Sequence, residues 1–288
     1  MPMDPGTGLT ILGTAIGGAK LVEKMLGPTA DYIGAGIRNW TERRVNNVAK
    51  IFKIAKEKLD DRMEEPGAIP PRVLKEVLDE GSFCDDPLTA EYFGGVLASS
   101  RSQVSRDDRG AYWAALVGRL SAYQIRSHYL VYRGIYDRFR GQDFKFNVED
   151  REKLSVLLPY FSYFHSMEFT EDERNQFVAL LHHSFFGLSK ESLVENFVYG
   201  DPEGLKKGLG EIYNPPEKGG IWVKPSAQGV ELFLWAHGQG KLMPSGLLHL
   251  DLAVPDGILP CAVVLSTEDL KATNITKDGE GPSQILAL

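Results

Sequence analysis

The chain has 288 residues, of which 43% are hydrophobic and 25% are charged, and this composition predicts a globular protein with one or two cores rather than a disordered chain. Its formal net charge of -7 disfavours a protein that coats nucleic acid, because phosphate binding depends on Lys and Arg side chains that release counterions. Cys84 and Cys261 are the only cysteines. They are too few for a disulfide framework or a zinc site, so a cytoplasmic location is expected.

The segment of residues 5–19 is uncharged and contains a small-xxx-small element, Gly13 to Gly17, with Ile16 between its ends. Small residues at this spacing let helix backbones approach closely, in soluble bundles as well as in membranes. The segment is shorter than the roughly 20 apolar residues of a spanning helix, and it lacks the positive start of a signal peptide. We therefore expect Gly13, Ile16 and Gly17 to pack against the bundle or another subunit, with membrane insertion as the alternative.

Apolar residues recur at steps of three and four over residues 29–63, which predicts one long amphipathic helix that ends before Pro66 and Gly67. The opposite face is polar and mostly basic, and a solvated surface is the simplest explanation for it. The predicted buried positions are Ile33, Ile37, Trp40, Val48, Phe52, Ala55 and Leu59, and the polar face contains Arg43, Asn46, Asn47, Lys50 and Lys53.

Prolines mark the first turns of the next two predicted helices, residues 72–79 and 88–99. A proline is tolerated there because its missing N–H would have no partner within the helix. A polar loop over residues 100–109 and a helix over residues 110–139 follow, and this helix is expected to kink or break near Leu120 and Ser121.

Arg119, Arg126, Arg133 and Arg140 recur every seven residues in this last helix, so they would share one stripe if the helix were continuous. Arginines interleaved with tyrosines can contact phosphates and stack on bases, which makes this segment a candidate nucleic-acid or partner contact. The same pattern also covers a bundle with long side-chain stems and ion pairs. Because nearby residues are acidic, we prefer this second interpretation.

Further helices are predicted over residues 148–163, 170–186, 190–198, 202–212 and 226–236, with a strand over residues 221–223. Thr170 and Glu173 have the spacing of a capping box. Several short helices followed by a turn, an apolar strand and a proline-led helix suggest a winged-helix-like module.

The candidate recognition helix of this module is residues 202–212. It offers only Lys206 and Lys207, rather than the side chains that read base edges, so sequence-specific DNA binding is not expected. Short strands are predicted over residues 248–252 and 260–265, and a flexible tail from residue 271.

No sequence motif for catalysis is present: a Walker A loop, a nucleophile elbow, an H-E-x-x-H zinc motif and a G-x-G-x-x-G fingerprint are all missing. His182 and His183 are adjacent and should point about 100° apart on a helix, so they are not expected to share a metal. The acidic pairs at residues 60–61, 85–86 and 107–108 fall at predicted helix ends, where capping explains them. We predict no catalytic, cofactor-binding or metal-ligating residue and no small-molecule substrate.

Several short patterns resemble those of a known family. They are Ile69-Pro70-Pro71-Arg72-Val73-Leu74, residues 84–88 and residues 92–98, with residues 26–34 and 120–125 at similar spacing on either side. Together they resemble the abortive-infection alpha (Abi-alpha) family of bacterial phage-defence proteins, over about residues 9–237. The resemblance implies a cytoplasmic bacterial protein in antiviral defence that helps to arrest the infected cell, and it brings no catalytic residues.

The predicted fold is mainly α: a multi-helix bundle followed by a small winged-helix-like α/β module and an extended C-terminal tail. The predicted parts are residues 1–64 (glycine-rich segment and long helix), 65–145 (helical core), 146–240 (winged-helix-like module) and 241–288 (short strands and tail).

The predicted function is non-enzymatic anti-phage defence through contact with a partner protein or through self-assembly. One alternative is a membrane-disrupting effector that becomes associated with the inner membrane on activation and inserts its N-terminal glycine-rich helix. A second alternative is a nucleic-acid-binding winged-helix protein.

Overall fold

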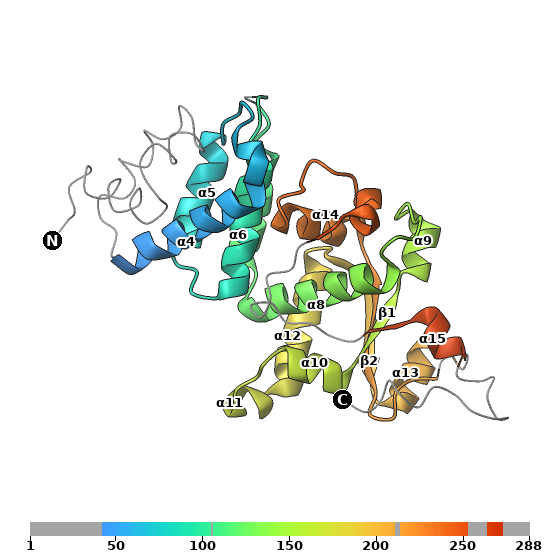
Figure 1. Ribbon diagram of the computed structural model, residues 1–288. Coiled ribbons are helices and arrows are strands. Elements are labelled where there is room, and N and C mark those ends of the chain that lie inside the picture. Colours follow the sequence, from blue (N-terminus) through green and yellow to red (C-terminus); the bar gives the residue numbers. More distant parts are fainter. Residues whose placement is uncertain (1–41, 105, 211–213, 253–263, 273–288) are drawn as a thin grey trace. The chain divides into compact units, whose positions relative to one another are not determined.

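The computed structural model describes residues 42–104, 106–210, 214–252 and 264–272, which are mainly helical and include a small four-stranded antiparallel sheet (Figure 1). This is the predicted fold class. The predictions for Gly13, Ile16 and Gly17, for residues 29–41 and for residues 273–288 lie outside the described residues.

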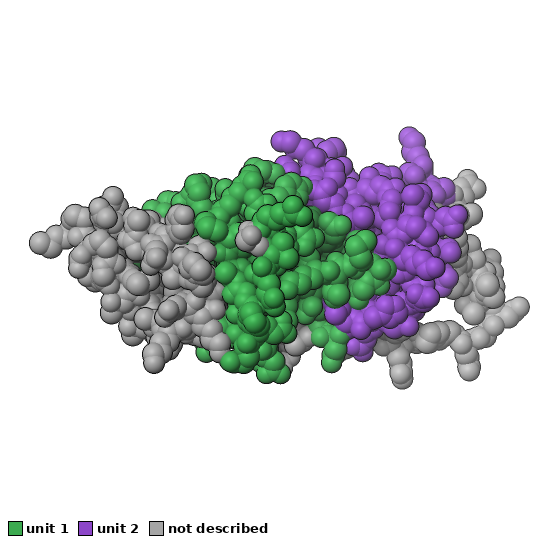
Figure 2. Space-filling model, turned by 90° about the horizontal axis from the view of Figure 1, so that it is seen from above, with its two compact units in different colours: residues 1–126, 230–247, 251–259 green, residues 127–229, 248–250, 260–288 purple. Residues whose placement is uncertain are grey.

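The chain divides into two compact units (Figure 2). Unit 1 comprises residues 1–126, 230–247 and 251–259, and unit 2 comprises residues 127–229, 248–250 and 260–288. The chain returns to unit 1 after residue 229, so each unit consists of segments that are separate in the sequence. The predicted parts with boundaries after residues 64, 145 and 240 stay a prediction.

Helix α4 of unit 1 buries one apolar face, as the periodicity predicts, whereas α6 is buried on nearly every side. Within the described part of the first helix, the predicted positions Val48, Phe52, Ala55 and Leu59 are all buried. Its elements are α4 (Glu42–Leu59), the 3-10 helix η3 (Asp60–Met63), α5 (Pro71–Gly81), α6 (Pro87–Ser100), α7 (Arg109–Arg119), the start of α8 (Ala122–Phe139), most of α14 (Ala227–Ala236) and part of the 3-10 helix η4 (Pro244–His249).

Helix α6 packs closely against two other helices of unit 1, α4 and α14. The Asp86 side chain caps its N-terminus by accepting a hydrogen bond from the Thr89 backbone N–H at 2.8 Å. A Cβ atom at Gly94 would overlap Ile54 of α4, and one at Gly95 would overlap the backbone of Ala236 in α14. Only glycine permits these two close approaches at once.

The predicted break between two helices is confirmed at Leu120 and Ser121, where α7 ends and α8 begins. The Ser121 backbone N–H donates to the Gln124 side-chain oxygen at 2.9 Å, and the Gln124 N–H donates to Ser121 Oγ at 3.3 Å. This reciprocal cap starts a new helix in place of continuing the old one.

Unit 2 contains the sheet, whose strand order is β2-β3-β1-β4 with every neighbouring pair antiparallel. In register, Val156 of β1 lies opposite Val223 of β3, and Val198 of β2 lies opposite Trp222. The strands are β1 (Val156–Pro159), β2 (Val194–Gly200), β3 (Gly220–Pro225) and β4 (Leu265–Ser266), and the helices are most of α8 with α9 (Val148–Lys153), α10 (Tyr160–Ser166), α11 (Glu171–Arg174), α12 (Phe177–Lys190), α13 (Pro202–Leu209) and α15 (Thr267–Ala272).

Helices cover both faces of the sheet: Figure 1 shows α12 on one side of the strands and α13 with α15 on the other. On the side covered by α13 and α15, a small hydrophobic core is formed by Leu157, Leu205, Trp222 and Leu270. The sheet, with β3 between β2 and β1, and these helices form the small α/β module that the sequence predicts. Helix α12 precedes strand β2, and α13 lies in the connection between β2 and β3.

Within the predicted recognition helix of residues 202–212, the structure describes α13 (Pro202–Leu209), which lies in the connection between β2 and β3. The role of this helix stays a prediction.

Three predictions of local structure are wrong. Residues 148–163 are not one helix but α9, β1 and α10, and residues 190–198 lead into β2 instead of forming a helix. Short apolar runs such as Val156-Leu157-Leu158 fit a buried strand and a buried helix equally well by periodicity. Residues 248–252 do not form a strand, because η4 extends to His249.

Candidate functional site

Helix α12 exposes an apolar stripe to solvent. Val178 is 68% exposed and Phe186 is 51% exposed, and His182 is exposed between them. The three side chains are spaced i, i+4 and i+8, so they lie along one side of the helix. Its buried side is formed by Leu181, Ser184, Phe185 and Leu188.

The stripe continues onto strand β2 through ring contacts. The Phe186 ring lies 5.1 Å from that of Phe197, and the His182 ring lies 5.9 Å from that of Tyr199, both edge to face. The rings of Phe197 and Tyr199 are nearly parallel to each other. We call Val178, His182, Phe186, Phe197 and Tyr199 the α12–β2 surface.

An exposed surface of this kind is unusual for a helix that also has a full buried side. A surface helix normally has polar residues opposite its apolar face. Large exposed apolar side chains that gather in one place mark contact sites for other molecules more often than isolated ones do. The α12–β2 surface is therefore the candidate functional site.

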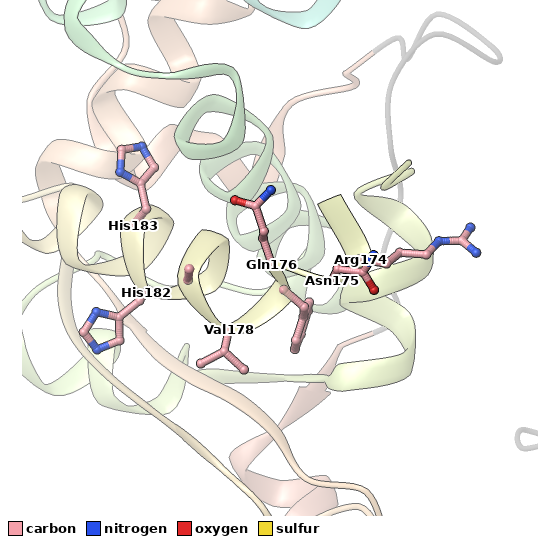
Figure 3. Close-up of a pocket in the computed structure, with 8 residues that line it drawn as sticks. Arg174, Asn175, Gln176, Val178, His182 and His183 are labelled. Carbon is pink, nitrogen blue, oxygen red and sulfur yellow. The ribbon is translucent and has the colours of Figure 1, made fainter. Parts of the chain in front are cut away.

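A hollow of about 810 Å³, open to solvent, lies at the N-terminal half of α12 (Figure 3). Its lining combines apolar side chains with polar ones, and Figure 3 shows His182 and His183 on different sides of the helix. The two imidazoles do not converge on one point, as their adjacency predicts. The lining residues are Arg174, Asn175, Gln176, Phe177, Val178, Ala179, His182 and His183.

The short helix α11 places carboxylates at this end of the surface. Glu171 and Asp172 are exposed. Thr170 and Glu173 form the predicted capping box, so the Glu173 carboxylate is held by the Thr170 backbone N–H at 2.7 Å. Arg174 donates from Nε to the Phe169 carbonyl at 3.1 Å.

The four arginines at seven-residue spacing are not on one continuous helix, because α7 ends at Arg119 and Arg140 follows the end of α8. Arg126 lies 3.8 Å from Asp86, and its side chain is only 17% exposed. Arg133 forms an ion pair with Asp137 at 2.7 Å and stacks on Tyr136. Arg119 and Arg140 are exposed. Arg126 and Arg133 thus lie beside acidic side chains, and the nucleic-acid or partner contact considered for the four arginines stays a prediction.

Charged groups also link the strands of the sheet to α9. Lys224 Nζ lies 2.8 Å from Glu152 and 2.9 Å from Glu195, and Arg151 Nε lies 2.8 Å from Glu195. Burial raises the pKa of Glu195, but hydrogen bonds from Lys224 and Arg151 outweigh this effect and leave its pKa lowered. The network holds α9 against β2 and β3.

Three titratable groups of unit 2 with strongly shifted pKa values belong to its core. Burial lowers the pKa of His128 to about 3, although the Gly229 carbonyl, 3.0 Å from Nε2, partly opposes the shift. Burial also raises the pKa of Tyr132 and of Tyr163 to about 12. These side chains are fully buried and keep their neutral forms, so they are structural.

Cys84 of unit 1 has little thiolate character. Burial raises the pKa of its thiol to about 11, and the carboxylate of Asp86 acts in the same direction. The thiol also donates to the Asp86 carbonyl at 3.4 Å. A thiol with a raised pKa is a poor nucleophile at neutral pH.

Two kinds of functional feature, metal-binding clusters and membrane-spanning helices, are absent from the described residues. Within the described ranges, no cluster of three or more His, Cys, Asp or Glu side chains could hold a metal ion. None of the helices in the part of the chain that the structure describes is long and apolar enough to cross a membrane. The candidate contact residues Gly13, Ile16 and Gly17 are not among these residues.

Comparisons with protein-family models, curated proteins and solved structures found no match to this chain. The α12–β2 surface was not predicted from the sequence, although a signal for it exists. Residues 177–188 carry apolar side chains on every side of a helix, with His182, His183 and Ser184 among them, and residues 194–199 end in Phe-Val-Tyr. Neither pattern tells which of the apolar side chains the rest of the fold covers.

Proposed function

We propose that this protein is a non-enzymatic bacterial defence protein that acts against phage in the cytoplasm through contact with another protein. The observation that supports the proposal is the α12–β2 surface, which exposes Val178 and Phe186 beside two half-buried aromatic rings. The phage-defence context comes from the resemblance to the Abi-alpha family.

The chemistry of the surface suits a protein partner. Aromatic residues are enriched in the cores of protein interfaces and supply much of their binding energy. Tyr199 and His182 add polar groups at the edge of this apolar area, as is common where one side of a ring meets a partner and the other meets water. The winged-helix-like module that the sequence predicts is a kind of fold used for protein contacts as well as for DNA.

Nucleic-acid binding is a second candidate because of one observation. Arg174, Asn175 and Gln176, which are residue types that read base edges, line the hollow at the start of α12. The exposed carboxylates of Glu171 and Asp172 lie in the same segment and repel phosphates. For this reason we place protein contact first.

The proposal is tested by plaque assays in bacteria that express the protein. Phe186→Ser should abolish protection while the purified variant keeps the circular dichroism spectrum and unfolding midpoint of the parent. Val148→Ser is the matched control, because Val148 is also an exposed apolar residue of unit 2, 65% exposed, on α9. Full protection by the Phe186 variant, or equal loss in the Val148 variant, would contradict the proposal.

A further inference from the structure

The α12–β2 surface combines apolar contact area with a charged end. Its apolar part runs along α12 from Val178 to Phe186, and the exposed carboxylates of Glu171 and Asp172 on α11 precede it. No ion pair to either carboxylate exists within the described residues. A ligand of this surface must therefore offer apolar groups together with positive charge at one end.

We propose that the α12–β2 surface binds an amphipathic helix of basic character from a partner protein, an inference that rests on the proposed function. The partner helix presents its apolar side to Val178, His182 and Phe186 and its Lys or Arg residues to Glu171 and Asp172. Recognition of this type, a helix laid on an exposed apolar surface, reads residues at helical spacing.

The spacing of the exposed residues favours a helical ligand. Side chains at i, i+4 and i+8 form a ridge, and ridges of this kind pack into the grooves of a second helix. Helix α12 has 14 residues and is about 21 Å long, so it can contact about four turns of a partner. His182 and the Tyr199 hydroxyl lie beside the ridge and can hydrogen-bond to polar groups at the margin of the contact.

Charge complementarity sets the chemistry of the ligand. The carboxylates on α11 attract Lys and Arg and repel phosphate, which disfavours nucleic acid and anionic lipid surfaces at this site. The basic face of α4 in a second copy of this chain carries exposed Lys50 and Lys53. It cannot supply the apolar side of the contact, because Val48 and Phe52 of α4 are completely buried.

The test uses the full-length protein and a fluorescein-labelled peptide of about 14 residues in which leucine and lysine alternate at helical spacing. Fluorescence anisotropy should show saturable binding that weakens as NaCl is raised from about 50 mM to about 300 mM. A peptide with glutamate in place of lysine, and a scrambled peptide of the same leucine and lysine content, should bind at least about tenfold more weakly.

Variants then assign the binding to this surface. Phe186→Ser should weaken binding by about tenfold, since a buried aromatic contact is lost. Glu171→Gln with Asp172→Asn should weaken it by about fivefold and reduce its dependence on salt. Val148→Ser should bind the peptide as the parent does.

Several results would overturn the inference. They are equal binding of the glutamate peptide, equal binding by the neutralised α11 variant, direct binding of labelled single-stranded DNA or of anionic vesicles to the protein that Phe186→Ser weakens, and a concentration-dependent dimer that Phe186→Ser dissociates in light scattering. If Phe186→Ser abolishes phage protection while the lysine peptide fails to bind, the inference is wrong but the proposed function stands. If peptide binding follows the predictions and protection is unchanged in Phe186→Ser, the proposed function is wrong.

Discussion

Helix α4 of unit 1 and helix α12 of unit 2 use their apolar residues in different ways. Val48 and Phe52 of α4 are fully buried, and its exposed side carries Lys50 and Lys53. Helix α12 buries Phe185 but leaves Val178 and Phe186 in solvent. The comparison teaches that the fold covers the apolar side of α4, whereas it leaves part of the apolar surface of α12 in solvent.

The close packing of unit 1 is most sharply tested at Gly95, where any Cβ atom would meet the Ala236 backbone. Gly95→Val should lower the free energy of unfolding by about 3 kcal/mol or more, because a backbone neighbour cannot move aside as a side-chain end can. Urea unfolding followed by circular dichroism measures the change. Gly246→Ala is the control, since a Cβ atom there makes only ordinary contacts, and it should change stability by less than about 1 kcal/mol. Equal effects of the two substitutions would refute the close packing of α6.

The second prediction concerns the core of unit 2, where the Tyr132 hydroxyl donates to the Leu193 carbonyl at 2.6 Å and accepts from the Ser226 N–H at 3.0 Å. Tyr132→Phe removes one partner from each of these backbone groups. It should cost about 2 kcal/mol of unfolding free energy, the usual effect of leaving buried polar groups without a partner. The same urea experiment measures it. A cost below about 0.5 kcal/mol would mean that these bonds do not stabilise unit 2.

The third prediction uses the pKa of His128, which burial lowers to about 3 from an ordinary value of about 6.5. The folded state holds the neutral imidazole, so its contribution to stability is complete above pH 6.5 and is lost progressively as the pH falls toward 3. Between about pH 7.5 and about pH 5.5 this group alone should reduce the unfolding free energy by about 1.4 kcal/mol.

The variant His128→Asn should lose this part of the pH dependence, although it is less stable at both pH values. The exposed, uncharged Val148 provides the comparison: Val148→Ser should keep the pH dependence of the parent. Parallel pH profiles for the parent and His128→Asn would show that His128 is not held neutral in the fold.

The smallest expected effect on stability is at the exposed residue Val178 of α12. Val178→Ser should change the unfolding free energy by less than about 0.5 kcal/mol, as should Val148→Ser, because both side chains are already in solvent. Only Val178→Ser should weaken the phage protection proposed for the α12–β2 surface. A clear loss of stability in Val178→Ser alone would mean that this residue belongs to the core of unit 2.

Much of the helical structure could be predicted because its signals are local. Pro71 at the first position of α5, the carboxylate cap of α6 at Asp86 and the capping box of Thr170 and Glu173 each satisfy backbone groups within a few residues. The break before α8 has the same origin in Ser121 and Gln124. Such interactions depend on neighbours in the sequence, so the sequence contains the information.

The sheet and the candidate site required the tertiary structure. Val156 and Val194 begin strands only because distant residues supply hydrogen bonds along β3, and periodicity over four to seven residues does not specify that partner. The arginines at seven-residue spacing were visible in the sequence, but the partners of Arg126 and Arg133 are decided by packing. Packing also decides the role of α12. The sequence sets the chemistry of its side chains and places apolar ones on every side of the helix. Which of them stay in water depends on what the folded chain places against each side of the helix.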